Sequence, residues 1–158
     1  MLRMKVKVVG VDRETMLPVV ILTDNDEQSF VPLVIGPAEA NAIAIVMENV
    51  EINRPLTHDL LLNSILALGA KVDRIILTDL ADDVYYAELC LLQGEKRLRI
   101  DCRPSDAIAL ALRAGAPIFV DEKVMAHAIS VPKEEDPELE EFRSFLKDLS
   151  PEDFQKDN

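Results

Sequence analysis

The chain has 158 residues, of which 49% are hydrophobic, and a formal net charge of −12 at pH 7. This length and apolar content suit one domain with a full core and exclude an intrinsically disordered chain. The excess of acids weighs against a nucleic-acid binder with a broad basic surface, because phosphate contacts dominate the affinity of such proteins. Local bases or bound metal ions remain the routes by which an acidic protein binds nucleic acid.

The cysteines and the hydropathy pattern bear on where the protein works. Cys90 and Cys102 lie in apolar, strand-like segments, and their spacing matches no zinc-binding pattern, so we expect buried, reduced thiols. No apolar run approaches the roughly 18 residues of a membrane span, and there is no cleavable leader pattern. These observations predict a cytoplasmic protein without membrane association.

Three strands and a helix are predicted in the first third of the chain. Met4–Val11 begins with alternating Lys and Val, which is typical of a strand with one solvent-facing side. Leu17–Thr23 and Ser29–Ile35 are two further apolar runs, separated by turn-forming residues, and the three runs are expected to form an antiparallel meander. Pro37–Glu48 follows as a helix whose alanines allow close packing.

Helices and strands alternate in the central part of the chain. A helix is expected over Thr57–Leu68, with Thr57 as its cap. Pro104 suits the first position of another helix, which Gly115 ends. The remaining candidates are a short helix over Asp121–Ala128 and strands over Val72–Leu80, Val84–Leu92, Arg97–Asp101 and Ile118–Val120.

The end of the chain differs from the body, and we divide the sequence into residues 1–132 and 133–158. The second part carries ten acids against four bases. An amphipathic helix is predicted there from apolar residues at helical spacing, namely Leu139, Phe142, Phe145, Leu146 and Leu149. Ser150–Pro151 is a second helix start. The tail is expected to dock on the body, on a sister subunit or on another protein.

A short internal repeat links two of the predicted helices. Pro37–Ala44 aligns with Pro104–Ala111 at a constant offset of 67 residues. Each copy follows an apolar strand-like run and places a carboxylate, Glu39 or Asp106, at the third helical position. Either a strand–helix unit was duplicated, or both segments satisfy the same preference for proline first and an acid third. Glu39 is therefore a candidate site residue, with helix capping as its alternative.

Four polar groups gather where a predicted strand meets the helix that begins at Pro104: Asp101, Arg103, Ser105 and Asp106. Neighbouring carboxylates can hold Mg²⁺ or Mn²⁺, and an arginine beside them can bind phosphate. The alternative is a capped helix start with an Asp–Arg ion pair. Few caps need all four groups, so the cluster is a candidate site.

A second candidate cluster lies around the start of the Thr57–Leu68 helix and contains Arg54, His58 and Asp59. His58 is one of only two histidines, and it can serve as a general base or as a metal ligand. Arg54 can bind phosphate. The alternative is an exposed histidine within a threonine cap. Adjacent residues on a helix do not face each other, so His58 and Asp59 need not act on one ligand.

Three segments together resemble the bifunctional nuclease (BFN) domain family: IGPAEANAIAI, RPLTHDLL and IDCRPSDAIALALRAGAPIFV. The resemblance runs in order from about Met4 to Val131. It implies an α+β fold with a curved, mainly antiparallel or mixed, barrel-like sheet, several packed helices and a C-terminal helical appendage. It also implies DNase and RNase activity and self-association, with a homodimer favoured.

The resemblance implies polar sites at Glu39, Thr57, His58, Asp59, Asp101, Arg103, Ser105 and Asp106. In a metal-assisted phosphodiester hydrolase, Asp101 and Asp106 would hold Mg²⁺ or Mn²⁺ and Arg103 would steady the scissile phosphate. His58 or Glu39 would activate water or protonate the leaving oxygen. Asp59 is counted with these catalytic candidates, and the expected substrate contacts are Arg54, Thr57, Arg103 and Ser105.

The rival interpretation is a non-enzymatic, oligomeric protein-interaction module. In that case the polar residues are caps and ion pairs, and the acidic tail recruits a protein partner. The net charge of −12 and the aromatic content of only 4% favour it, because few aromatics are available to stack on bases. The family resemblance favours the nuclease, with nucleic acid as its substrate.

Overall fold

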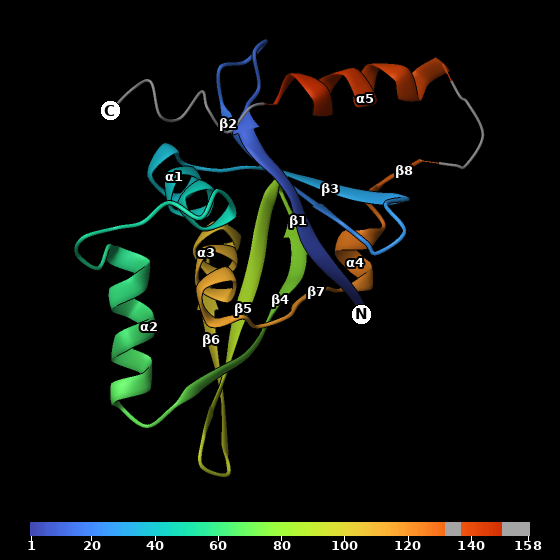
Figure 1. Cartoon of the computed structure of the whole chain (residues 1–158). Helices are drawn as coiled ribbons and strands as arrows, with labels where there is room; N and C mark the ends of the chain where they lie inside the picture. Colours follow the sequence, from blue (N-terminus) through green and yellow to red (C-terminus); the bar gives the residue numbers. More distant parts are fainter. Residues whose placement is uncertain (132–136, 150–158) are drawn as a thin grey trace.

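The protein is an α+β fold built around one mixed sheet (Figure 1). Its structure, a computed structural model, describes residues 1–131 and 137–149. The sequence predicts every described helix and strand except β8, although α4 ends before Ala128. In chain order the elements are β1 (Leu2–Val11), β2 (Pro18–Thr23), β3 (Ser29–Val34), α1 (Pro37–Met47), α2 (Thr57–Ala67), β4 (Lys71–Ala81), β5 (Val84–Gln93), β6 (Lys96–Cys102), α3 (Pro104–Ala114), β7 (Ile118–Val120), α4 (Glu122–Met125), β8 (Ile129–Ser130) and α5 (Pro137–Asp148).

The eight strands lie in the order β6-β5-β4-β7-β1-β2-β3-β8. All neighbours are antiparallel except β4 and β7, which run parallel. The expectation of a strongly curved, barrel-like sheet is wrong, because the sheet is open. Closure requires the two end strands to pair with each other. Here β6 and β8 are the ends, and the two residues of β8 pair only with Ser29 and Phe30 of β3.

The starts of three helices follow from local sequence. Pro37 and Pro104 occupy the first positions of α1 and α3, where the missing N–H of proline loses no intrahelical bond. The expectation that Thr57 caps α2 is wrong. Leu56 holds the N-cap position instead, and its backbone N–H donates to Asp59 Oδ2 at 3.0 Å. The third-position carboxylate therefore holds this helix start, because it can reach back to the N-cap N–H.

The main core lies between the sheet and the helices α1 and α3. These two helices pack on each other, and α3 also packs on β4 and β5. Their buried faces are rich in alanine, which lets the backbones approach closely. The alanines concerned are Ala40, Ala42, Ala44, Ala107, Ala109 and Ala111. Close packing of α1 on α3 brings their N-termini into one region of the surface.

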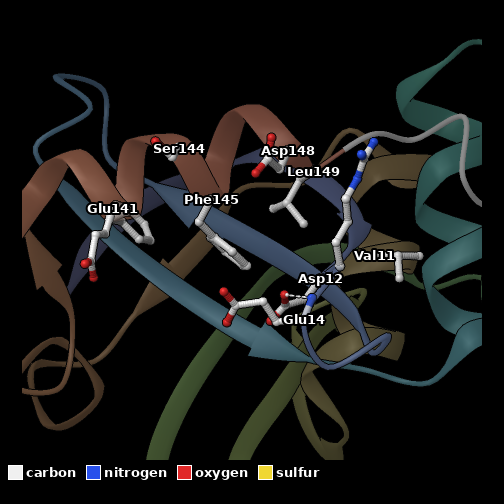
Figure 2. A pocket seen from close by; sticks show the side chains of 10 residues that line it. Val11, Asp12, Glu14, Glu141, Ser144, Phe145, Asp148 and Leu149 are labelled. Carbon is white, nitrogen blue, oxygen red and sulfur yellow. Dashed lines mark hydrogen bonds between the residues drawn. The ribbon is translucent and has the colours of Figure 1, made fainter.

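The tail helix α5 covers the opposite face of β2 and β3. Phe142 of α5 meets Phe30 of β3 edge to face, with ring centroids 5.2 Å apart. Leu149, directly after α5, is buried in the same apolar cluster. Figure 2 shows the side chains of Phe145 and Leu149 directed toward the strands. The described part of the tail thus docks on the body, and a protein partner for it stays a prediction. The second helix start, Ser150–Pro151, lies outside the described residues.

Two further predictions concern the state of the two cysteines and the lack of a membrane-spanning helix. Cys90 is buried and Cys102 is half-buried, and both are free thiols. Burial, with Asp101 nearby, raises the pKa of Cys102 to about 11, so its thiol stays protonated at neutral pH. Within residues 1–131 and 137–149, the helices are all too short or too polar to cross a membrane.

Candidate functional site

The N-termini of α1 and α3 meet, and Arg103 joins them. Arg103 donates from Nε to Asp106 Oδ2 at 2.8 Å and from Nη2 to Glu39 Oε1 at 2.6 Å. Glu39 and Asp106 occupy equivalent positions in the two repeated segments. The two copies of the repeat therefore come together in space, and one guanidinium is shared between two carboxylates.

Gly36, which precedes α1 as Arg103 precedes α3, makes room for this arrangement. A Cβ atom on residue 36 would collide with Glu39 Oε2, so a side chain there would push the carboxylate away from Arg103. Gly36 was not predicted as a site residue. The sequence does mark this position: the residue before the aligned prolines is glycine in the first copy of the repeat and arginine in the second.

His58 joins the cluster from the first turn of α2. Its Nε2 lies 2.9 Å from Asp106 Oδ1, and its side chain is buried. Burial raises the pKa of Asp106, but hydrogen bonds from His58 and Arg103 outweigh burial and lower that pKa below its usual range. Hydrogen bonds to Asp106 and Glu39 raise the pKa of Arg103. The carboxylate and the guanidinium therefore both stay charged at neutral pH.

The cluster forms the polar end of a groove between α2 and the β5–β6 hairpin. The groove has a volume of about 710 Å³. Its polar lining comprises Thr57, His58, Ser64, Asp101, Arg103 and Asp106, and its other lining residues are Leu60, Leu61, Ile65, Leu89, Leu91, Ile100 and Cys102. The residues predicted to share a catalytic cleft, His58, Asp101, Arg103 and Asp106, therefore border one space.

Three of the predicted site residues lie elsewhere. Asp59 accepts a hydrogen bond from Arg113 Nε at 3.0 Å, and this largely buried ion pair joins α2 to α3. Ser105 is buried beside a different cavity, which Gly36 also borders. Arg54 is exposed in the connector before α2 and does not line the groove. His58 and Asp59 thus contact different partners, as expected for neighbouring helical residues, which point to different surfaces.

The predicted Mg²⁺ or Mn²⁺ site would use the carboxylates of Asp101 and Asp106 as ligands. Asp106 already contacts His58 and Arg103 through its two oxygens, and Asp101 is exposed at the end of β6. Among residues 1–131 and 137–149, no three His, Cys, Asp or Glu side chains are grouped so that they could hold a metal ion. Magnesium requires several oxygen ligands. The donor set does not fit a protein-held divalent cation, and metal binding stays a prediction.

Comparison with known protein families shows which family this chain belongs to. The model of the bifunctional nuclease domain matches residues 20–133, which include α1, α2, α3 and the whole polar cluster. The chain belongs to the bifunctional nuclease domain family. Uncharacterized protein Rv1829 of Mycobacterium tuberculosis strain H37Rv is 38% identical over 162 residues, which cover 95% of this chain and 97% of that protein.

Plant members of the bifunctional nuclease group are more distant. Bifunctional nuclease 1 of Oryza sativa subsp. indica is 24% identical over 109 residues, covering 67% of this chain and 33% of that protein. Bifunctional nuclease 2 of Arabidopsis thaliana is 28% identical over 107 residues, covering 66% of this chain and 32% of that protein. The similarity to these plant proteins is therefore confined to about a third of their length.

In this bifunctional nuclease domain the cluster offers acid–base chemistry beside an anion-binding group. His58 contacts Asp106 through Nε2, which leaves Nδ1 as the ring nitrogen that can take up a proton. The Arg103 side chain is 65% exposed, and within the described chain its hydrogen bonds come from Nε and Nη2 only. Its Nη1 can therefore donate to a phosphate oxygen.

Proposed function

We propose that this domain is a nuclease that hydrolyses phosphodiester bonds at the polar end of the groove. The observation that carries the proposal is one carboxylate, Asp106, in contact with both a histidine and an exposed arginine. Membership of the bifunctional nuclease domain family supports it, as does the distant similarity to plant proteins named bifunctional nucleases. The net charge of −12 means that phosphate binding depends on a local base such as Arg103.

His58 is the general base of this proposal. Asp106 accepts a hydrogen bond from His58 Nε2–H, which fixes the tautomer with a lone pair on Nδ1. A water molecule gives a proton to Nδ1 while its oxygen forms a bond to phosphorus. The phosphorus–oxygen bond to the leaving group breaks, and the leaving oxygen takes a proton from the imidazolium or from solvent. Asp106 stabilises the imidazolium between these steps.

Arg103 binds the phosphate in this proposal. Negative charge on the non-bridging oxygens grows in the transition state, and a fixed guanidinium stabilises it. Glu39 holds that guanidinium in place through Nη2. Thr57 and Asp101 border the same end of the groove and are the next candidates for substrate contact.

A nuclease assay on the purified full chain tests the proposal. His58→Gln is expected to lower kcat/KM on a fluorogenic single-stranded oligonucleotide at least about 100-fold, the usual contribution of a general base. Asp106→Asn is expected to lose about as much, because the tautomer of His58 is no longer fixed. His127→Gln is the matched control, since His127 is the other histidine of the chain and is exposed. Equal cleavage by the wild type and His58→Gln would reveal a contaminating nuclease.

The same assay addresses the divalent cation. DNA and RNA oligonucleotides are compared with and without EDTA and added Mg²⁺ or Mn²⁺. Activity that EDTA abolishes and Mg²⁺ or Mn²⁺ restores would support a cation held jointly by substrate and protein. Activity that EDTA leaves unchanged would contradict the predicted metal role of Asp101 and Asp106, and would leave the histidine mechanism standing.

A second candidate function is a non-enzymatic interaction module, and one observation favours it. Each member of the polar cluster already has a partner within the chain, as a purely structural network requires. On this proposal Arg103→Ala mainly lowers the melting temperature or dissociates the oligomer, and the purified wild type cuts no nucleic acid. Lost nuclease activity in Arg103→Ala, with melting temperature and assembly unchanged, contradicts it.

A further inference from the structure

Strand β6 is an unpaired edge in the part of the chain that the structure describes. It ends the sheet and pairs only with β5, and six of its seven residues are exposed. An edge strand presents its outward N–H and C=O groups to any strand laid beside it. The other end of the sheet, β8, has only two residues. The longer open edge is therefore β6.

Leu98, Ile100 and Cys102 lie on one side of β6, and Ile100 and Cys102 line the groove. Strand residues alternate between the two faces of a sheet, and the register sets Leu98 opposite Leu91 and Ile100 opposite Leu89. Leu98 is 38% exposed and Ile100 45% exposed, while Leu60 on α2 is 60% exposed. Among the residues that the structure describes, nothing covers these three apolar side chains fully, and exposed apolar side chains that lie near one another are typical of an interface.

The charges along β6 complement those of a second, antiparallel β6. Full overlap of two seven-residue strands puts Arg99 at the centre. Arg97 then faces the partner subunit's Asp101, and Asp101 faces the partner subunit's Arg97. Leu98 faces the partner subunit's Ile100. Opposite charges and apolar pairs across strands both stabilise a sheet.

The central position is the one like-charged pair of this register. Arg99 would face the partner subunit's Arg99, but Arg99 Nη1 lies 3.4 Å from Glu88 Oε2 in each copy, which offsets the repulsion. Neighbouring registers are less favourable. Centring on Leu98 sets Arg97 against the partner subunit's Arg99. Centring on Ile100 sets Arg99 against the partner subunit's Asp101, but it also sets Arg97 against the partner subunit's Arg103, so like-charged pairs are as many as opposite-charged ones.

We propose that β6 pairs with β6 of a second copy of this chain, antiparallel and centred on Arg99. The pairing joins two sheets into one across a two-fold axis. It covers Leu98 and Ile100 of both copies, with the exposed leucines of the two α2 helices beside them. It also gives the seven backbone positions of each β6 a second neighbour.

The pairing adds a residue to the candidate site, and this part rests on the proposed function. Lys96 lies on the same side of β6 as Leu98 and Ile100. In the paired strands the partner subunit's Lys96 lies opposite Cys102, the residue before Arg103. Each groove therefore gains an ammonium group from the other subunit at its polar end. A second cation there increases the attraction for phosphate in a protein that is acidic as a whole.

Swapping the charges of Arg97 and Asp101 tests the pairing. The dimer Kd of each full-length variant is measured by sedimentation velocity. Arg97→Glu sets a glutamate against the partner subunit's Asp101 and is expected to raise the dimer Kd at least about tenfold. Asp101→Arg sets an arginine against the partner subunit's Arg97 and is expected to weaken the dimer similarly. The double variant restores opposite charges, and its Kd is expected to return to within about threefold of the wild type. Lys123→Glu on α4 is the matched control.

Each outcome decides a different point. A monomeric wild type, or a double variant that stays dissociated while its circular dichroism is native, overturns the pairing. Lys96→Gln is expected to keep the dimer and to raise KM for the oligonucleotide several-fold at unchanged kcat. An unchanged KM in an active dimer overturns the shared site alone. Absence of nuclease activity refutes the proposed function, while the sedimentation result still decides the pairing.

Discussion

The two ends of the sheet are covered differently. At the β2–β3 end, α1 packs against β2 on one face and α5 covers the other face, so that five of the six residues of β2 are buried. At the β6 end, six of seven strand residues are exposed. The nearby helix α2 presents Leu60 and Leu66 to solvent, as does Leu68 directly after it. Within residues 1–131 and 137–149, the tail helix covers one end of the sheet and the other end stays uncovered.

This difference separates stability from function. The covered end carries apolar contacts from both faces, and such burial is the main source of folding stability. The open end carries the groove, the His58–Asp106–Arg103 cluster and the unpaired strand. The proposed nuclease site and the proposed subunit contact both need accessible surface, and both lie at the end of the sheet that the described residues leave open.

The largest expected effect comes from a matched pair of isoleucines. Ile21 of β2 is fully buried, whereas Ile100 of β6 is 45% exposed. Ile21→Ala is expected to lower the free energy of unfolding by about 4 kcal/mol, because it removes buried methyl groups and leaves a cavity. Ile100→Ala is expected to lower it by less than about 1 kcal/mol in dilute protein. Urea denaturation at low concentration measures both.

The stability loss in Ile100→Ala, measured at several protein concentrations, tests whether a second copy covers β6. If the loss in Ile100→Ala grows with protein concentration, a second copy covers this strand, because association with the folded state adds to apparent stability. Equal losses at Ile21 and Ile100 at every concentration would contradict the distinction between a covered and an open end.

The next effect concerns the ion pair that holds α2. The Arg113 side chain is only 4% exposed and donates to Asp59. Asp59→Ala leaves this cation buried without its partner, and the free energy of unfolding is expected to fall by about 2 to 3 kcal/mol. Asp59→Asn keeps a hydrogen-bond acceptor and is expected to lose less. Thermal denaturation of both variants tests this, and a loss no larger in Asp59→Ala than in Asp59→Asn would contradict it.

A smaller effect is expected at the tail. Phe142→Ala removes the edge-to-face contact with Phe30 and part of the cover over β2 and β3. Because Phe142 is only half-buried, the expected loss is about 2 kcal/mol, below the usual range for a buried phenylalanine. Nuclease activity is expected to stay unchanged, since α5 does not border the groove. Lost activity in a folded Phe142→Ala variant would show that the two ends are coupled.

The smallest effect is a pH dependence at Asp106. Its pKa in the folded protein lies below the ordinary value of 3.8, because His58 and Arg103 outweigh burial. The ionised carboxylate therefore adds stability above about pH 4, and this stability is lost as the pH falls through the lowered pKa. The difference in unfolding free energy between the wild type and Asp106→Asn is expected to shrink below about pH 4. A constant difference would mean that ionisation of Asp106 contributes nothing.

The sequence predicts the features that depend on near neighbours. Alternation at Met4–Val11 and apolar runs between turn residues placed every strand but β8, and the prolines at positions 37 and 104 placed two helix starts. Clustering of polar residues near Arg103 and near His58 also pointed to the groove. These signals work because helix starts and strand faces are set by a few consecutive residues.

The features that the sequence did not predict depend on contacts between residues from different elements. Local sequence patterns carry no information about those contacts. The sequence places Asp59 among the catalytic candidates, but its partner is Arg113 on another helix. Gly36 matters only because Glu39 folds back over it to reach Arg103. The open sheet follows from how briefly β8 pairs with β3, and two residues leave too weak a pattern to predict.

The shared arginine has a consequence for how the protein matures. Arg103 and Glu39 are 64 residues apart in the chain, and His58 and Asp106 are 48 apart. Contacts between residues so distant in sequence close long loops, whose entropy cost is met only when the elements between them are already packed. The cluster is therefore expected to be among the last parts of the chain to order. The nuclease activity proposed for the cluster would then begin only once the whole domain had folded.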